Sequence, residues 1–368
     1  MNIAYYMPFK PMGHPNPSGD LVTGTELYNF LEGKGHTIEQ VSRFRCRWLY
    51  LKPWKLVQLP LEIKKSMNRC RILRPDIWLS YHSYYKAPDF FGPVCSRRLN
   101  IPYILFQGIY STKRRRSMKT WPGFWLNRRV LLAARMVFTN KRADKHNLLR
   151  LLPPDRVCYV PPGIHPEAYR FDQKARQDLR ESWQVGRQPV VFTAAMFRPG
   201  VKADGIREVI RSCAVLSAQG TGLKLVVAGD GAERDALLRE AERALPGAVR
   251  FVGKISRPEM YRYYSAADLF AFPGVQESLG MVYLEAQSCG LPVVAYREWG
   301  ASEAVIHGRT GLLATAADKE TLTANIEQLV LDKDLRKKMG QAAGEHVRKT
   351  HDLEKNYTII EQTLQDIS

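Results

Sequence analysis

The chain has 368 residues, of which 45% are hydrophobic and 25% are charged. This length favours two domains over one, and no apolar run approaches the roughly 20 residues that a membrane-spanning helix needs. The six cysteines are scattered without a C-x-x-C pair, which indicates a reducing compartment and argues against a metal site. We therefore expect a cytoplasmic protein.

The formal net charge of +19 lies entirely in the first half of the chain. Residues 1–170 contain 29 basic and 10 acidic side chains, whereas residues 171–368 contain 26 of each. Segments 41–75 and 111–142 each hold ten basic residues, interleaved with aromatic ones. Such a mixture fits an anionic membrane surface best. An ordinary solvated basic face is the next alternative, and we expect no nucleic acid partner.

The first half begins with a predicted strand at 3–7 and not with a signal peptide, because the N-terminus lacks a cationic start and a cleavage site. A loop then leads through Ser18 and Gly19 into a helix. Two further strands are predicted at 74–83, ending near His82, and at 101–111. The order of strand and helix is typical of an α/β domain.

The second half repeats this alternation. A predicted strand at 190–196 feeds a loop that contains Arg198 and Lys202. A strand, a glycine-rich turn and a helix follow over 224–237, and the next strand, 249–256, contains Gly253.

The stretch from 266 to 311 reads as strand, loop, helix and strand, which is the βαβ unit of a parallel sheet. The predicted helix stops at Gly290, with Pro292 just beyond. The loop before the helix, FPGVQESLG, is rich in small residues and follows a buried strand at its carboxyl end. Open α/β sheets bind ligands at this end.

Two glutamates with seven residues between them lie at this predicted helix. We expect Glu277 just outside the helix and Glu285 about two turns inside it, with backbones up to roughly 12 Å apart. Ser278, Leu279 and Gly280 are predicted in the first turn, whose unpaired N–H groups and dipole favour phosphate. A nucleotide-sugar has hydroxyls at both ends and a pyrophosphate between them, so it suits this arrangement. The alternative is a pair of solvated surface charges.

This stretch resembles the donor site of the retaining glycosyltransferases of family 4, whose fold is called GT-B. The family pattern is roughly an aspartate, an apolar strand, Pro-Ser, Glu, Gly, then Leu-Glu-Ala and Gly-x-Pro-Val. The matching residues of this chain are Asp268, Pro273-Gly274, Glu277, Gly280, Leu284-Glu285-Ala286 and Gly290-Leu291-Pro292-Val293. The resemblance covers nearly the whole chain, and it is strong in 190–315 and weak in 37–135.

The resemblance implies an α/β fold with two Rossmann-like, doubly wound parallel-sheet domains that face a cleft. Segment 156–171 is similar to the family's interdomain linker. We therefore expect an acceptor-binding domain at 1–168 and a nucleotide-sugar donor-binding domain at 169–351. The tail resembles the helix that crosses back in this fold, so helix 352–368 is expected to complete the first domain.

The resemblance also implies a role for each site residue. Glu277 would hold hexose hydroxyls and stabilise an oxocarbenium-like transition state, while Glu285 would bind the ribose. Arg198 and Lys202 would grip the donor pyrophosphate and neutralise charge on the leaving group without a metal. The other residues expected to bind the donor are Gly19, Gly253, Ser278, Leu279 and Gly280.

This chain departs from the family on the acceptor side. Ser18 replaces one glycine of a pair, and Gln107, before Gly108, replaces a histidine. Glutamine can bond a sugar hydroxyl but cannot act as a base near neutral pH. Front-side attack needs less of a protein base, because the leaving phosphate can take the acceptor proton. His82 is a candidate substitute, and a purely structural histidine is the alternative.

Asp332-Lys333-Asp334 matches the metal-binding Asp-x-Asp of another glycosyltransferase class. It stands at a predicted helix start, so we interpret it as a cap with first-turn charge. We expect no essential metal and no other cofactor.

The expected function is retaining transfer of a hexose from a nucleoside diphosphate to an acceptor hydroxyl. The acceptor would be a lipid-linked or lipopolysaccharide-type glycan, and the protein would be peripheral on the inner face of a bacterial membrane. The alternatives are a same-fold sugar-nucleotide epimerase or phosphorylase, and a non-catalytic module that binds membrane or nucleic acid. The sequence leaves the nucleotide base, the sugar, the acceptor, the linkage and the oligomeric state open.

Overall fold

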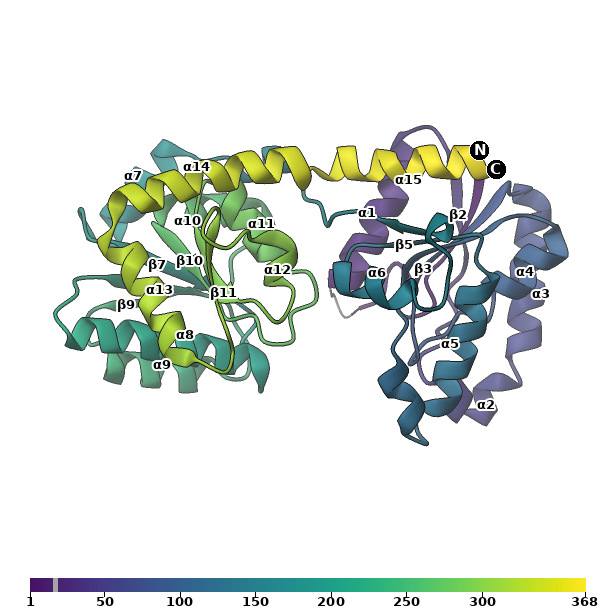
Figure 1. The fold of residues 1–368 in the computed structure, drawn as a ribbon, viewed down its shortest axis with the longest axis horizontal. Helices are drawn as coiled ribbons and strands as arrows, with labels where there is room; N and C mark the ends of the chain where they lie inside the picture. Colours follow the sequence, from purple (N-terminus) through teal and green to yellow (C-terminus); the bar gives the residue numbers. More distant parts are fainter. Residues whose placement is uncertain (16–18) are drawn as a thin grey trace. The chain divides into compact units, whose positions relative to one another are not determined.

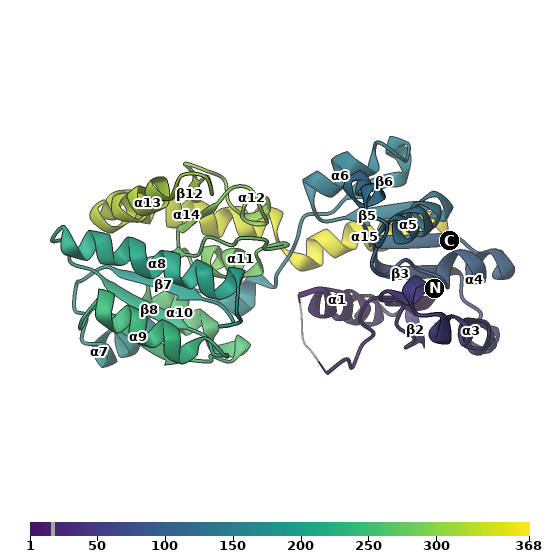
Figure 2. The same cartoon turned by 90° about the horizontal axis from the view of Figure 1, so that it is seen from below.

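A computed structural model describes residues 1–15 and 19–368, which form two compact units (Figures 1 and 2). Each unit has one parallel sheet covered by helices, as expected for the α/β class. Ser18, the replacement for the family's glycine, lies outside the described residues.

The boundary between the units lies slightly earlier than we predicted. The first unit consists of Met1–Pro161 and Glu354–Ser368, and the second of Pro162–Leu353. Residues 162–168, which we expected in the first domain, therefore belong to the second unit. The backbone explains this difference, because the N–H of Ile164 donates to the carbonyl of His351 at 2.9 Å and the N–H of Leu353 donates to the carbonyl of Ile164 at 2.8 Å.

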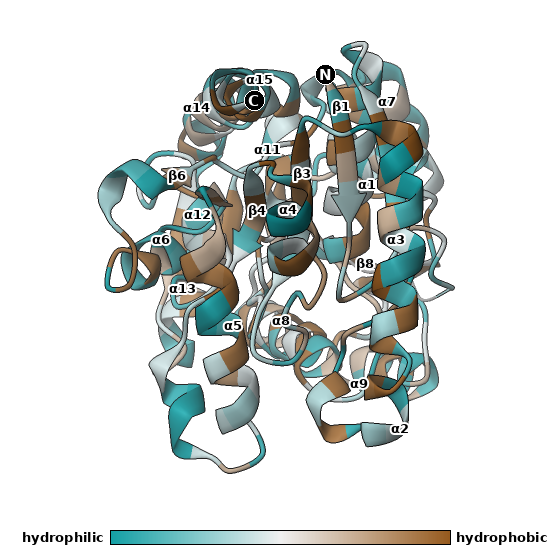
Figure 3. Ribbon diagram, turned by 90° about the vertical axis from the view of Figure 1, so that its right-hand side faces the viewer, coloured by the Kyte–Doolittle hydropathy of each residue, from teal (hydrophilic) through white to brown (hydrophobic). Residues whose placement is uncertain are grey.

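The sheet of the first unit has the strand order β2-β1-β3-β4-β5-β6 in the described residues, and every pair is parallel. From β1 the chain adds β2 on one side and β3 to β6 on the other, so the topological switch point lies between β1 and β3. Most residues of these strands are buried, and Figure 3 shows brown, hydrophobic positions in β1 and β3. The strands are β1 Asn2–Tyr6, β2 Thr37–Ser42, β3 Ile77–Ser83, β4 Tyr103–Gly108, β5 Met136–Thr139 and β6 Val157–Tyr159.

Helices cover both faces of this sheet. The last helix of the chain lies beside α1, where the ring of Tyr357 contacts that of Phe30 at 5.5 Å between centroids (Figure 1). Farther along the same helix, Glu361 is 3.0 Å from Nε2 of His36. The described helices are α1 Gly19–Gly33, α2 Pro53–Leu56, α3 Leu59–Leu73, α4 Gly92–Leu99, α5 Trp121–Ala133, α6 Arg142–Leu148 and α15 Leu353–Ile367, with short 3-10 helices η1 Leu49–Leu51, η2 Thr112–Arg116 and η3 Pro154–Arg156.

The sheet of the second unit, all of whose residues are described, has the order β12-β11-β10-β7-β8-β9. This is the doubly wound order of the Rossmann fold, and its switch point lies between β7 and β10. A ligand crevice is therefore expected at the carboxyl ends of these two strands. The strands are β7 Val190–Ala194, β8 Lys224–Ala228, β9 Val249–Gly253, β10 Leu269–Ala271, β11 Val293–Tyr296 and β12 Gly311–Ala314.

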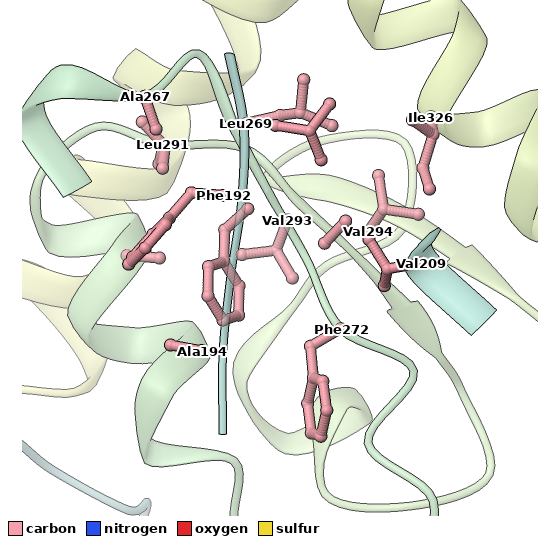
Figure 4. Close-up of a cluster of buried hydrophobic side chains, with 14 of the residues drawn as sticks. Phe192, Ala194, Val209, Ala267, Leu269, Phe272, Leu291, Val293, Val294 and Ile326 are labelled. Atoms are coloured by element: carbon pink, nitrogen blue, oxygen red, sulfur yellow. The ribbon is translucent and has the colours of Figure 1, made fainter. Parts of the chain in front are cut away.

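Two helical layers enclose this sheet. Helices α8, α9 and α13 lie on one face, and α10, α11 and α14 lie on the other (Figure 1). Between sheet and helices, Phe192, Val209 and Val294 are fully buried in one apolar cluster (Figure 4). The helices are α7 Gln173–Ser182, α8 Val201–Ala218, α9 Arg234–Ala244, α10 Met260–Ala266, α11 Met281–Ser288, α12 Ala301–Ala304, α13 Lys319–Leu331 and α14 Lys333–Thr350, with 3-10 helices η4 Pro166–Tyr169 and η5 Arg257–Glu259.

Helix α14 begins as the sequence predicted. The carboxylate of Asp332 accepts a hydrogen bond from the N–H of Leu335 at 2.8 Å, so it caps the helix. Among the described residues, no helix is both long and apolar enough to cross a bilayer.

Asp268, the first residue of the family pattern, fixes the amino end of β10 to its surroundings. Its carboxylate accepts from Arg176 at 2.7 Å, from Arg180 at 2.9 Å and from the N–H of Val190 at 2.8 Å. Burial opposes ionisation of this carboxyl, but Arg176 and Arg180 outweigh it and lower the pKa. Because the folded pKa lies below the unfolded one, this contribution to stability is present above pH 4 and is lost as the pH falls through the folded pKa.

We predict that Asp268→Asn lowers the free energy of unfolding by about 2–3 kcal/mol at pH 7, because it leaves two partly buried arginines without their anion. Urea unfolding of the variant and of wild type, followed by circular dichroism, measures the difference. Asp235→Asn, at an exposed carboxylate on α9, is the control and should cost less than about 0.5 kcal/mol. Equal stabilities of the two variants would contradict this role.

Candidate active site

The switch point of the second unit brings two predicted residues into contact. Lys202 is the second residue of α8, after β7, and Glu277 lies in the loop after β10. Their side chains form an ion pair, and the Lys202 ammonium also lies 5.4 Å from the ring centre of Phe272. Both side chains are partly exposed, so they remain open to solvent and to a ligand. Arg198 is exposed in the loop that leads to the start of α8, and no ion-pair partner is found for it among the described residues.

Helix α11 begins later than the sequence predicted. Ser278–Gly280 precede the helix, which starts at Met281, and Glu285 therefore lies one turn inside it and not two. Gly280 ends the loop in the left-handed conformation, with φ +66°, and this interrupts the helical path. The N–H groups at the helix start are those of Met281 and its successors, so the anion-binding end that we expected is displaced by three residues, from Ser278 to Met281.

Tyr283 determines the shape of the loop before α11, and sequence analysis did not identify it. Its hydroxyl donates to the carbonyl of Phe272 at 3.1 Å. A Cβ on Gly274 would lie 2.0 Å from this hydroxyl, and one on Gly280 would lie 2.3 Å from the ring. The packing of Tyr283 therefore requires glycine at both positions. Gly280 was predicted only to let an anion approach the helix, and it also makes room for this ring.

A pocket of about 490 Å³ opens at the carboxyl ends of β7, β8 and β9. Its floor includes Gly229 and Gly231, where a Cβ would meet the carbonyl oxygens of Ala195 at 1.9 Å and Phe197 at 2.6 Å. One wall is mostly apolar, and the rest carries two cations and two carboxylates. The lining residues are Ala194, Ala195, Met196, Ala228, Gly229, Asp230, Gly231, Lys254, Ile255, Arg257, Met260, Val282 and Glu285.

Glu285 is the buried charge of this pocket. It is only 6% exposed, and its Oε2 accepts a hydrogen bond from the hydroxyl of buried Tyr264 at 3.0 Å. Nε of Arg257 lies 3.7 Å from Oε1 and donates to the Tyr169 hydroxyl at 3.2 Å. Burial raises the pKa of Glu285, while Arg257 and the two tyrosine hydroxyls oppose the rise. Sequence analysis missed Tyr264, Arg257 and Tyr169 because no motif marks them.

Two glycines predicted to bind the donor, Gly253 and Gly19, lie in different units. Gly253 ends β9 with φ +71°, accepts from the N–H of Gly229 at 2.8 Å, and its neighbour Lys254 lines the pocket. Gly19 begins α1 in the first unit, and a Cβ there would meet no described atom within 4 Å.

The predicted acceptor-side residues lie at the carboxyl ends of two neighbouring strands of the first unit, β3 beside the switch point and β4 next to it. Tyr81 pairs with Phe106 and Ser83 with Gly108, so His82 and Gln107 lie at equivalent places on β3 and β4. Both adopt left-handed backbone conformations, with φ of +66° and +61°. Such values cost non-glycine residues about 1–3 kcal/mol, and functional sites are among the places where they cluster.

These two side chains are buried but poorly satisfied. Among the described residues, neither ring nitrogen of His82 and not Nε2 of Gln107 has a hydrogen-bond partner. Nδ1 of His82 lies 3.4 Å from Oδ1 of Asp20, and its ring stacks on Tyr84 at 4.7 Å. Burial lowers the pKa of His82 although Asp20 opposes this, so the imidazole is neutral near pH 7. Gly108 is confined, since a Cβ would lie 2.7 Å from Leu131.

We predict that Glu285→Gln stabilises the folded protein increasingly as the pH rises from 4 to 7. In wild type, the pKa of Glu285 is higher in the folded state than in the unfolded state, so the protonated carboxyl favours folding. This contribution to stability is complete below the unfolded pKa and is lost as the pH rises through the folded pKa. Glutamine never ionises and still accepts from Tyr264. Thermal melts of both proteins across this range should show a widening gap in Tm. Burial also raises the pKa of Asp89, but this residue is present in both proteins, so its effect cancels in the difference in Tm. A gap that narrows with pH would contradict this prediction.

Comparison with known proteins agrees with this geometry. Residues 176–346 match the family described as glycosyl transferases group 1. A GDP-mannose-dependent alpha-(1-6)-phosphatidylinositol monomannoside mannosyltransferase from Mycobacterium tuberculosis is 30% identical over 197 residues, which are 51% of this chain and 50% of that protein. A D-inositol 3-phosphate glycosyltransferase from Thermobispora bispora is 32% identical over 217 residues, which are 56% and 50%. The chain thus matches about half the length of these relatives.

The crystal structure of HepE from Anabaena in complex with UDP matches 100% of both chains, with a TM-score of 0.79 at 20% sequence identity. At this identity the likeness concerns the fold, and it agrees with the two parallel sheets described above. The fold class is therefore GT-B, and the match to the glycosyl transferases group 1 family lies within its second unit.

Proposed function

We propose that this chain transfers a hexose from a nucleoside diphosphate to an acceptor hydroxyl, with retention of the anomeric configuration. The observation that carries this proposal is the pairing of Lys202 with Glu277 beside a pocket whose wall holds buried Glu285. A cation for phosphate and two separate carboxylates for sugar hydroxyls meet the needs of a nucleotide-sugar.

The pocket is assigned to the nucleoside part of the donor. Its apolar wall, with Ile255 and Met260, would contact the base, and Glu285 would accept hydrogen bonds from the ribose hydroxyls. Burial makes ionised Glu285 costly, and two hydroxyl donors would replace some of the solvation that it lost. Tyr264 would hold the carboxylate in the orientation that ribose requires.

The diphosphate is assigned to Lys202, Arg198 and the first-turn N–H groups of α11. Arg198 is exposed in the loop that precedes α8, so its guanidinium would supply a second cation beside Lys202. A diphosphate at this place would give the Lys202 ammonium a second anionic partner and would release Glu277 toward the hexose. Charge that develops on the leaving phosphate would then be stabilised by groups already in position, without an essential metal or other cofactor.

The acceptor proton has no obvious protein base in this proposal. Gln107 cannot take it, and the leaving phosphate on the same face of the sugar can. His82 is neutral and buried near Gln107, so we assign it to positioning the acceptor or the hexose rather than to proton transfer.

We assign the acceptor to lipid-linked or lipopolysaccharide-type glycans at the inner face of a membrane. The excess charge of +19 in the first half supports this, because such acceptors and their bilayers are anionic. The relative from Mycobacterium tuberculosis, whose name gives a phosphatidylinositol monomannoside as its acceptor, supports the same class.

We predict that one nucleoside diphosphate among UDP, GDP, ADP and dTDP raises the Tm, in EDTA as well as in Mg²⁺. A ligand at about 100 times its Kd stabilises by about 2.7 kcal/mol, which is an easily measured shift. Lys202→Ala should abolish most of the shift, while Lys174→Ala, at an exposed lysine of α7, should not. No shift with any nucleotide would refute the donor site and favour a non-catalytic binding module.

We predict that Glu277→Gln keeps the nucleotide-induced Tm shift but lowers turnover by about 100-fold or more, because the lost charge stabilises only the transition state. Turnover is measured as nucleoside diphosphate release from the matching sugar nucleotide, with a bacterial membrane lipid extract as acceptor. Glu242→Gln, at an exposed residue of α9, is the matched control. Product NMR gives the anomeric configuration. An isomerised sugar product, or a turnover rate that is the same without the lipid extract, would favour the epimerase or phosphorylase alternative instead.

A further inference from the structure

One end of the first unit exposes large apolar side chains among cations. We call this surface the docking face. It is formed by α2 and the residue after it, and by the segment from η2 through α5 (Figures 1 and 3). Its apolar members are strongly exposed: Trp54 63%, Val57 77%, Met118 95%, Trp121 52% and Trp125 38%. Its exposed cations include Lys55, Lys113, Arg115, Arg116 and Lys119.

Residues just before α2 contact the segment from η2 through α5. The Lys119 ammonium lies 5.6 Å from the ring centre of Trp48, just before η1. A Cβ on Gly123 of α5 would lie 2.5 Å from the Tyr50 hydroxyl, so this glycine lets α5 pack closely on η1. The exposed residues of α2 and those of the segment from η2 through α5 therefore lie on either side of this contact.

The docking face lies at the carboxyl edge of its sheet, where His82 and Gln107 are also found. The segment before α2 follows β2, and the segment before α5 follows β4, so both emerge at this edge. A series of ring contacts joins the face to His82: His82 stacks on Tyr84 at 4.7 Å, Tyr84 meets Tyr85 at 5.5 Å, and Tyr85 meets Trp48 at 5.9 Å.

The composition of the docking face selects among possible partners. Segment 111–142 has ten basic residues and no acidic one, which fits an anionic partner. Nucleic acid would be satisfied by the cations, but it would not require exposed Trp54, Val57 and Met118. Tryptophan and aliphatic side chains beside lysine and arginine fit the boundary between headgroups and acyl chains of a bilayer. An anionic bilayer therefore accounts for both the cations and the exposed apolar side chains of the docking face.

We propose that the docking face inserts its apolar side chains into an anionic bilayer and so holds His82 and Gln107 next to the lipid surface. Trp54, Val57 and Met118 enter the interface, while Lys113, Arg115 and Arg116 contact lipid phosphates. The ring series from Trp48 to His82 then sets the position of the acceptor-side residues against the headgroups. The acceptor part of this inference rests on the proposed function, whereas the bilayer contact does not.

Vesicle sedimentation tests the apolar part. Wild type should bind phosphatidylcholine vesicles with about 30% phosphatidylglycerol and should bind pure phosphatidylcholine vesicles far less. Combined Trp54→Ser, Val57→Ser and Met118→Ser should reduce the partition coefficient by about tenfold or more. The matched control, Ile72→Ser with Phe171→Ser and Leu331→Ser, removes equally exposed apolar residues elsewhere and should bind like wild type. Unchanged nucleotide-induced Tm shifts would establish that the donor site of each variant is intact.

The charged part needs its own control. Combined Lys113→Gln, Arg115→Gln and Arg116→Gln should reduce binding by about 100-fold, since each cation near the surface contributes about fivefold. Removal of three lysines on α14, Lys337→Gln with Lys338→Gln and Lys349→Gln, lowers the net charge equally and should have little effect.

Several results would overturn the proposal. These are failure of wild type to bind either vesicle, equal loss in the docking-face and control variants, and tighter binding to a DNA or RNA oligonucleotide than to anionic vesicles. Failure of the proposed function is distinguishable from these results, because nucleotide binding is measured without vesicles and vesicle binding without nucleotide.

Discussion

The parallel pairing of β7 with β10 is the constraint on which the candidate site depends. These strands are far apart in sequence, yet Val191 pairs with Leu269 and Phe192 with Phe270. Asp268 fixes the amino end of the pair through two arginines, and the Lys202–Glu277 ion pair spans the crevice at the other end. The order of strands therefore converts two distant loops into neighbours, and the apolar cluster beneath them keeps both loops in place.

The pocket beside this crevice shows a conflict between stability and chemistry. A buried carboxylate whose pKa is raised costs the fold free energy at neutral pH, and an apolar residue would avoid that cost. Tyr264, Tyr169 and Arg257 offset only part of it. Retention of a charge with several partners, on the wall of an open pocket, is typical of a binding group and not of a structural one.

The first unit shows the same conflict in its backbone. His82 and Gln107 have strained conformations, and their buried polar atoms lack partners among the described residues. Their strands end at the edge that also carries the docking face. Strained backbone, unsatisfied polar groups and exposed apolar residues are thus found together at this edge of the sheet.

The sequence was sufficient for the fold class and for most elements, because long buried apolar runs and glycine or proline stops are local signals. It also predicted Glu277, Lys202 and Glu285 as site residues, because they match a family pattern of fixed order, and the structure places Lys202 and Glu277 in contact. It misplaced the start of α11, since the left-handed turn at Gly280 depends on the ring of Tyr283. It placed the domain boundary a few residues late, since the pairing of Ile164 with the end of the second unit is a long-range contact.

The tertiary structure alone decided which residues support the motif and how the charged groups are paired. Tyr264, Arg257 and Tyr169 reach Glu285 from other elements of the second unit, and no spacing in the sequence marks them. The charge and aromatic content of segments 41–75 and 111–142 was likewise evident from the sequence, but only the tertiary structure showed that the two segments contact each other. Composition and local periodicity can be determined from neighbouring residues in the sequence. Burial and ion pairing depend on residues that are far apart in sequence and come into contact only in the folded chain.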